Sequence, residues 1–272
     1  MWQVVPWSSI CRFLADEKRL NPQATKCFPS STIDAMTRAR ICVIGAMDEE
    51  IAEFLSHAKM LNIVERRSFR FHEASLFGVP VVVVKCGVGK VFAALIAQTL
   101  IDTYQPAAVI STGVAGALSK SLRIGDVVVG RDSAHHDMDA RALGFMRGHI
   151  PYTDFRFFTT DEKFSELALA ARLDGGHKIV HGRILSGDQF VSGDREATHG
   201  HLTGELSGDA VDMETAAIAQ VCAVNETPFV SIRTISDHAD GSAHIDFNTF
   251  LPVIASNSFH IIRKMLVGIS EQ

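Results

Sequence analysis

The chain has 272 residues, 47% of them apolar and 21% charged, and a net charge of −5. This length and apolar fraction suffice for one α/β domain with a full hydrophobic core, and no block of lysine and arginine indicates a nucleic-acid partner. No apolar run approaches the ~18 residues that a membrane-spanning helix needs, and the N-terminus lacks the pattern of a signal peptide, so we expect a soluble, cytoplasmic protein with no membrane partner.

Five cysteines are scattered along the chain, with no Cys-x-x-Cys pair and no spacing typical of a zinc site. We expect them to be reduced thiols, several of them in core strands or helices. They are Cys11, Cys27, Cys42, Cys86 and Cys222.

Residues 1–39 differ in composition from the rest of the chain. They contain both tryptophans and a polar run, Pro29-Ser30-Ser31-Thr32, immediately before the first strong strand signal. We interpret them as an N-terminal appendage, partly disordered, or as an artefact of start-codon choice. A regular pattern begins at residue 40, so residues 40–272 are expected to form the single folded domain.

The first predicted elements alternate between buried strands and helices. Residues 40–46 indicate a short buried strand, and a helix with three acids in its first turn begins at Asp48. A hairpin with strands at 69–76 and 81–86 follows. A glycine-containing turn then leads into an apolar helix at 91–104.

Later in the chain the same alternation continues. Strands are expected at 107–112, 126–130, 178–185, 210–213 and 228–235, and helices at 160–173, 214–224 and 247–267. This order predicts an α/β fold with a mixed, mostly parallel central sheet flanked by helices. Ligands of such folds bind where strands end, so the strand-to-helix junctions are the places to search.

The first three junctions carry acids, glycines and small residues. Of Asp48-Glu49-Glu50, only one acid needs to face a cleft, and the others serve the helix dipole. Residues 85–90 lack the spacing of a phosphate loop, so we favour a tight strand-to-helix turn. Residues 111–117 are interpreted as a small-residue turn, which lets a ligand or another backbone come close.

The last two junctions carry charged residues in apolar surroundings. Glu214 follows a predicted strand, where a carboxylate can accept hydrogen bonds from the two hydroxyls of a ribose. Arg233 and Asp237 lie in an apolar strand, and burying them without partners is costly, so function explains them better than packing. In a regular strand they share one face with Ile235, and Ser236 points to the other.

Four motifs together resemble the 5′-methylthioadenosine/S-adenosylhomocysteine nucleosidase family, and the similarity extends over residues 40–267. In order they are Ile44-Gly45-Ala46-Met47-Asp48-Glu49-Glu50, Ser186-Gly187-Asp188-Gln189-Phe190, Asp212-Met213-Glu214 and Arg233-Thr234-Ile235-Ser236-Asp237. The resemblance implies a three-layer phosphorylase/nucleosidase-like fold, a nucleosidase domain at 40–272, and a homodimer.

The resemblance also implies catalytic roles. Asp237 would be the general acid that protonates N7 of adenine, and Glu50 would deprotonate the attacking water. Arg233 would hold that water or Glu214, and Glu214 would accept the ribose hydroxyls. These roles match the reaction, because departure of adenine leaves a cation-like sugar that needs an acid at the base, a nearby carboxylate and a base for water.

The substrate-binding residues follow from the same resemblance. Met213 is expected beneath the sugar, and Phe190 is expected to stack on adenine. The backbone of Val191 should meet the base edge, and Ser236 should orient Asp237.

Two positions depart from the family pattern. Val114 stands where a serine is common, next to Ala115 and Gly116, which removes a hydroxyl near the expected water site. Leu143 stands where an aromatic residue is frequent. It lies in the segment 141–151 that aligns with the lining of the 5′ pocket across a dimer interface, together with Phe145 and Pro151.

The sequence thus predicts a hydrolase that cleaves 5′-substituted adenine nucleosides, such as methylthioadenosine, S-adenosylhomocysteine and 5′-deoxyadenosine, to adenine and the substituted ribose. Carboxylates at the first junction would repel phosphate, so water is the expected nucleophile. No metal or organic cofactor is expected, and the His135-His136-Asp137-Met138-Asp139 stretch is interpreted as a polar loop. Two alternatives remain open: an aminodeoxyfutalosine hydrolase using the same site, and a catalytically silent nucleoside-binding or surface-exposed protein.

Overall fold

The computed structural model describes residues 40–192, 198–240 and 243–271. The predicted N-terminal appendage lies outside these residues. Within them, no helix is both long enough and apolar enough to span a membrane.

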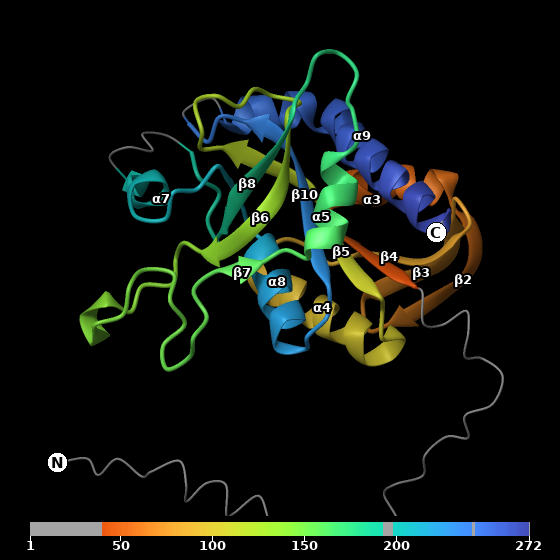
Figure 1. The fold of residues 1–272 in the computed structure, drawn as a ribbon, viewed down its shortest axis with the longest axis horizontal. Helices are drawn as coiled ribbons and strands as arrows, with labels where there is room; N and C mark the ends of the chain where they lie inside the picture. The colour runs from red at the N-terminus through yellow and green to blue at the C-terminus, as the bar shows by residue number, and fades with distance from the viewer. Residues whose placement is uncertain (1–39, 193–197, 241–242, 272) are drawn as a thin grey trace, which may run out of the picture. The chain divides into compact units, whose positions relative to one another are not determined.

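A mixed β-sheet forms the centre of the fold (Figure 1). Its strands are β1 (Ile41–Gly45), β2 (Lys59–Arg66), β3 (Phe69–Leu76), β4 (Val79–Lys85), β5 (Ala108–Ala117), β6 (Val127–His135), β7 (Phe158–Thr159), β8 (Ile179–Ser186), β9 (Ala210–Asp212) and β10 (Phe229–Asp237). The described helices are α3 (Asp48–His57), α4 (Lys90–Tyr104), the short 3₁₀ turn η2 (Arg141–Leu143), α5 (Glu162–Leu169), α7 (His201–Gly204), α8 (Thr215–Val224) and α9 (Ala243–Ser270).

The strand order is β10-β6-β8-β9-β5-β1-β4-β3-β2. The central strand β1 pairs in parallel with β4 and β5, while β2, β3 and β4 form an antiparallel meander at one edge. Because β10 pairs with both β6 and β5, the five strands β10, β6, β8, β9 and β5 close into a ring. Ring closure brings the ends of β5, β9 and β10 together.

Successive side chains of the central strands point to opposite faces of the sheet, and both faces are covered by helices. Ile41 and Val43 of β1 belong to one core cluster with residues of α3, α5 and α9, whereas Cys42 and Ile44 belong to another with residues of α4 and α8. A strand buried on both faces needs apolar residues at every position, as the sequence of β1 has. The predicted α/β architecture with helices on both faces is therefore confirmed.

Several predicted boundaries differ from the structure. Residues 111–117, expected to form a turn, continue β5 to Ala117, because pairing with β10 and β9 extends the strand. β6 likewise continues to His135 through its pairing with β8. The strand β2 was not predicted; it is an exposed edge strand without a periodic apolar pattern, and it is held by pairing with β3.

The cysteines of the described domain are free thiols in the core. Cys42, Cys86 and Cys222 are buried, and none of these three forms a disulfide. This confirms the interpretation of these three as reduced core residues.

Candidate active site

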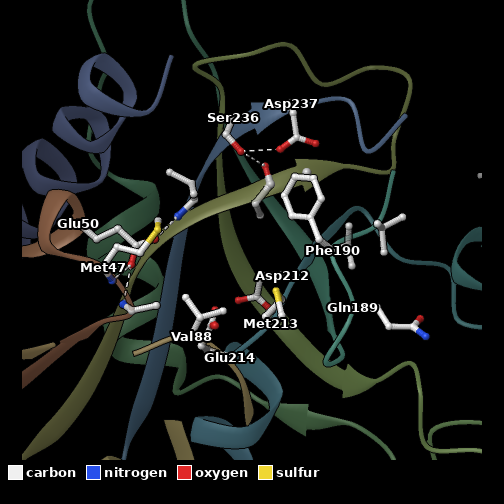
Figure 2. A pocket seen from close by; sticks show the side chains of 16 residues that line it. Met47, Glu50, Val88, Gln189, Phe190, Asp212, Met213, Glu214, Ser236 and Asp237 are labelled. Atoms are coloured by element: carbon white, nitrogen blue, oxygen red, sulfur yellow. Dashed lines mark hydrogen bonds between the residues drawn. The ribbon is translucent and has the colours of Figure 1, made fainter. Parts of the chain in front are cut away.

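One pocket of about 260 Å³ lies where β1, β5, β9 and β10 end (Figure 2). All five junctions singled out in the sequence contribute to its wall. It is lined by Ala46, Met47, Glu50, Val88, Val114, Ala115, Gly116, Gln189, Phe190, Val191, Val211, Asp212, Met213, Glu214, Ser236 and Asp237. The sheet topology thus gathers residues that are up to 191 positions apart, from Ala46 to Asp237.

Glu50 is the acid of the first junction that faces the pocket. Its Oε2 accepts hydrogen bonds from the backbone N–H groups of Ala46 at 2.6 Å and Met47 at 3.0 Å, and its Oε1 accepts from the N–H of Val114 at 3.1 Å. Burial raises the pKa of Glu50, while Arg233 and the three amides oppose the rise. Glu50 is therefore a fixed carboxylate with an enhanced affinity for a proton.

Asp48 and Glu49 point away from this site. Both are exposed, and Asp48 forms an ion pair with Lys85 at 2.7 Å. As expected for two of the three acids, their negative charges lie in the first turn of α3, where the helix dipole favours them.

Val114 takes part through its backbone. Its N–H donates to Glu50, so this contact does not require the hydroxyl of the serine that is common at this position. Val114, Ala115 and Gly116 all line the pocket, as expected.

We predict that Gly113→Ala removes most of the activity and also lowers the melting temperature, because the φ of +154° at this position is one that alanine rarely adopts. A Cβ at this position would overlap Oε1 of Glu50 and lie 2.9 Å from its Cδ. The end of a flexible side chain moves more easily than the backbone, so the carboxylate is displaced, and loss of positioned base catalysis costs about 10²-fold or more. Steady-state rates and thermal melting test this; wild-type activity in the variant would contradict the positioning of Glu50.

Glu214 lies on the pocket floor at the beginning of α8. Its Oε1 accepts a hydrogen bond from the N–H of Gly89 at 2.8 Å, and the side chain is buried. Burial raises its pKa to about 8, and the negative charge of Asp212 adds to the rise. Glu214 lines the pocket, so hydroxyl groups of a bound ligand can donate to its carboxylate.

The 85–90 segment is a tight turn, as favoured from the sequence. Gly89 has a φ of +100°, a conformation that glycine adopts without strain. The N–H of Lys90 donates to Asp188 at 2.9 Å, so carboxylates of the protein satisfy the first amides of α4. The turn thus supports Glu214, and its amides at Gly89 and Lys90 are already bonded to carboxylates of the protein.

Asp237 ends β10 on the opposite side of the pocket from Glu50 (Figure 2). Its Oδ2 accepts from the hydroxyl of Ser236 at 2.7 Å, and its Oδ1 accepts from the N–H of Ala239 at 2.7 Å. A Cβ on Gly116 would lie 2.8 Å from Oδ1, so the glycine makes room for this carboxylate. The hydroxyl of Ser236 is thus placed to orient Asp237, and this expected role stays a prediction.

The regular alternation predicted for the end of β10 is wrong. The pairing with β5 shifts register between Ile235 and Asp237, and Ser236 and Asp237 both line the pocket while Ile235 is buried in the core. Such a bulge redirects side chains at the end of a strand. It brings the serine and the acid to the same site.

Arg233 lies behind the pocket wall and does not line the pocket. Its Nε donates to Oδ2 of Asp212 at 2.8 Å, and its NH2 group donates to Oγ of Ser111 at 2.8 Å. Its side chain is thus bonded to Asp212 and Ser111, and its expected role, holding the attacking water or Glu214, stays a prediction. A guanidinium in this position acts on the pocket carboxylates through its charge.

Three residues expected to contact the substrate line the pocket wall. Phe190 is 48% exposed, so its ring is open to a flat ligand, whereas Val191 is buried at its side. Met213 projects into the pocket near Asp212 (Figure 2). An aromatic face and a thioether form a largely apolar cradle, which suits a purine and the underside of a sugar.

Three other expected pocket residues do not reach this pocket. Leu143, Phe145 and Pro151 belong to a segment that extends away from the sheet around η2, and Leu143 is 65% exposed. In this segment the ring of Phe145 contacts that of Tyr152 at a centroid distance of 5.4 Å. Their predicted role at a second subunit therefore stays a prediction.

The stretch 135–139 makes ordinary protein contacts. Nε2 of His135 lies 2.9 Å from Oε1 of Gln220, and Nζ of Lys90 donates to Asp137 at 2.6 Å. Within the described ranges, no group of three or more His, Cys, Asp or Glu side chains is arranged to hold a metal ion.

The sequence did not indicate roles for Asp212, which lines the pocket, or for the polar residues behind it. Asp212 accepts hydrogen bonds from Ser186, Thr215 and Arg233, and Ser111 accepts one from Arg233. Asp212 was visible as an acid beside Glu214, but its partners come from distant strands. Only the register of β8 and β9, which pairs Ser186 with Asp212, reveals the network.

Comparisons with known proteins identify the family of the chain. The sequence pattern of the phosphorylase superfamily matches residues 40–267. A 5′-methylthioadenosine/S-adenosylhomocysteine nucleosidase of Geobacillus kaustophilus is 39% identical over 231 residues, which cover 84% of this chain and 96% of that protein.

Two solved structures extend the comparison. The Neisseria meningitidis 5′-methylthioadenosine/S-adenosylhomocysteine nucleosidase in complex with methylthio-immucillin-A is 38% identical, with a TM-score of 0.79, and covers 84% of this chain and 99% of its own. The futalosine hydrolase of Helicobacter pylori is 30% identical, with a TM-score of 0.79, over 86% of this chain and 98% of its own. With its fold, its pocket and these relatives in agreement, the chain belongs to the phosphorylase superfamily and, within it, to the 5′-methylthioadenosine/S-adenosylhomocysteine nucleosidase family.

Proposed function

We propose that this protein hydrolyses the N-glycosidic bond of 5′-substituted adenine nucleosides, including methylthioadenosine, S-adenosylhomocysteine and 5′-deoxyadenosine. The observation that carries the proposal is the arrangement of three buried carboxylates. Glu50 and Asp237 lie on opposite sides of one pocket, and Glu214 lies on the floor beside Met213 (Figure 2). A nucleoside with its base at Phe190 and Asp237 would place its sugar over Met213 and Glu214.

In this arrangement each carboxyl group has one task. Protonated Asp237 gives its proton to N7 of adenine, so the base leaves as a neutral molecule with the electrons of the broken C1′–N9 bond. Glu50 accepts a proton from the water that attacks C1′ on the other face of the sugar. Glu214 accepts hydrogen bonds from the ribose hydroxyls and stabilises the positive charge that develops on the sugar.

Water is a better nucleophile than phosphate in this pocket. No residue among its described lining is a lysine, arginine or histidine, whereas Glu50, Asp212, Glu214 and Asp237 are acids. Phosphate would enter a site of like charge without a paired cation. This supports hydrolysis over phosphorolysis.

The 5′ substituent defines a second candidate substrate. The Helicobacter pylori futalosine hydrolase has the same fold at 30% identity, so aminodeoxyfutalosine belongs among the substrates to be tested. The wall at Phe190 and Gln189 is open to solvent, which leaves room for substituents larger than a methylthio group.

We also propose that the protein works as a homodimer in the cytoplasm. Exposed apolar side chains gather on the neighbouring helices α4 and α8, at Val91, Phe92, Leu95 and Val224. Burying such side chains against a second copy is favourable, and the segment with Leu143 would then be free to reach the partner's pocket. Sedimentation analysis would distinguish a dimer from a monomer.

The buried, reduced thiols support the proposed location in the cytoplasm, which is a reducing compartment.

Release of adenine tests the proposed reaction directly. The panel holds methylthioadenosine, S-adenosylhomocysteine, 5′-deoxyadenosine, aminodeoxyfutalosine and inosine, each with and without phosphate. We expect adenine from the 5′-substituted adenine nucleosides at rates that phosphate does not increase. Formation of a sugar-1-phosphate would overturn the hydrolase assignment, and no adenine from any of them would favour a nucleoside-binding protein.

A further inference from the structure

A buried ion pair joins Asp212, which ends β9 and lines the pocket, to Arg233 in β10, which lies behind the pocket wall. The two side chains are 2% and 3% exposed, and Nε of Arg233 lies 2.8 Å from Oδ2 of Asp212. Asp212 also accepts hydrogen bonds from Oγ of Ser186 and Oγ1 of Thr215, both at 2.5 Å. Both of its oxygens are thus held by the protein, and its orientation is fixed.

Arg233 also interacts electrostatically with the two carboxylates of the reaction site. Its charge acts on Asp212, Glu50 and Glu214, but only Asp212 receives a hydrogen bond from it. One positive charge cannot neutralise three negative ones, and its effect is strongest on the nearest partner. Glu50 is left with three backbone amides, and Glu214 with one.

We propose that Asp212 is a positioning residue for the hydrolysis. Its ion pair holds Arg233 behind the pocket wall and neutralises most of the guanidinium charge, so the charges of Glu50 and Glu214 are not fully neutralised by Arg233. This inference rests on the function proposed above. A buried anion without a neighbouring free cation holds a proton more tightly. Glu50 is therefore a stronger base toward water than it would be beside an unpaired arginine.

The electrostatics of the site agree with this arrangement. Burial raises the pKa of both Glu50 and Glu214, and Arg233 lowers each of them only in part. The charge of Asp212 contributes directly to the raised pKa of Glu214.

Other charged or titratable groups around these carboxylates are already accounted for. Burial raises the pKa of the Cys86 thiol, which therefore stays neutral and adds no charge. Beyond the Gly89 turn, Lys90 is paired with Asp137 at 2.6 Å, and Asp188 accepts from the N–H of Lys90. On the far wall Asp237 is the remaining acid of the pocket, and Asp48, Glu49 and Lys85 lie outside it.

A purely structural role of Asp212 makes a different prediction. The carboxylate also accepts from the N–H of Thr215 at 3.1 Å and so stabilises the beginning of α8. Loss of a helix cap lowers stability and, through it, the rate, but it does not move the pH at which the rate falls. The pH profile therefore separates the two roles.

The experiment compares kcat/KM for adenine release against pH in the full-length wild-type protein and in Asp212→Asn. We expect the acid limb of the pH profile to move to lower pH by about one unit or more in this variant. The substitution removes the charge of Asp212 beside Glu214, and an unpaired Arg233 then stabilises ionised Glu50 and Glu214. The control is Ser111→Ala, which removes the other hydrogen bond of Arg233 without changing any charge. Its acid limb should stay at the wild-type pH.

A second pair of variants decides the question even if Asp212→Asn does not fold. Arg233→Gln should move the acid limb to higher pH, and the double variant Asp212→Asn/Arg233→Gln, a neutral pair of nearly the same shape, should return it to the wild-type position. The inference is overturned if Asp212→Asn folds and its acid limb stays at the wild-type pH. It is also overturned if the acid limb of the double variant stays where that of Arg233→Gln lies. If wild type releases no adenine, the proposed function fails; an active wild type with an unmoved limb refutes this inference alone.

Discussion

Asp237→Asn is expected to lower kcat for adenine release by at least about 10²-fold, the typical contribution of a general acid. The amide has nearly the shape of the carboxyl group but has no proton to give to N7. Ser236 and the N–H of Ala239 both donate to the carboxylate, so the amide can keep one of these bonds in the same place. Affinity for an adenine nucleoside should therefore change little.

The loss of rate is measured by adenine release, and affinity by calorimetry with a nucleoside analogue that is not cleaved. Asp102→Asn, at an exposed carboxylate of α4 that bonds Gln98, is the matched control and should behave as wild type. Unchanged turnover in Asp237→Asn would refute its role as the acid. A large loss of affinity instead would assign Asp237 to binding.

Glu50→Gln should lose a similar factor of about 10² or more in kcat, because a neutral amide cannot accept a proton from water. The three N–H groups that point at the carboxylate make the substitution more severe, since the amide nitrogen of glutamine is itself a donor. Glu49→Gln, one position earlier in the same helix and exposed, is the control and should keep full activity.

The pH dependence provides an independent readout for Glu50. Burial raises its pKa, so protonation removes the base as the pH falls, and it does so at a higher pH than for an ordinary glutamate. The wild-type rate should therefore fall on the acid side above the usual range of a glutamate. Residual activity of Glu50→Gln should lack this dependence on Glu50; a fully active variant would point to a different base.

The position of the reacting groups could be predicted largely because each one follows a strand. Glu50, Glu214 and Asp237 stand out in the sequence as charged residues at the ends of apolar segments, and parallel strands bring such ends to one edge of a sheet. All three line the pocket. Phe190 and Met213 were placed by family resemblance, and they also line it.

The partners of these groups could not be predicted in the same way. Gly89 supports Glu214 from 125 positions away, and Arg233 binds Ser111 across 122 positions. Such contacts join segments that become neighbours only when the sheet and its helices assemble, and a local sequence pattern does not specify which distant segment that neighbour is. Leu143, Phe145 and Pro151 were expected to line a pocket across a dimer interface, and a single chain does not test that role.

The sequence by itself determined which residue types are available for the chemistry and which segments are buried, because apolar periodicity and isolated charges are local properties. The tertiary structure decided how far β5 and β6 extend, because their pairing with neighbouring strands overrides local turn signals. The tertiary structure also decided that a bulge in β10 brings Ser236 and Asp237 to the same pocket, and that Arg233 donates a hydrogen bond to Asp212. These features arise because the strands close into a ring, in which backbone segments that are distant in the sequence form hydrogen bonds with each other.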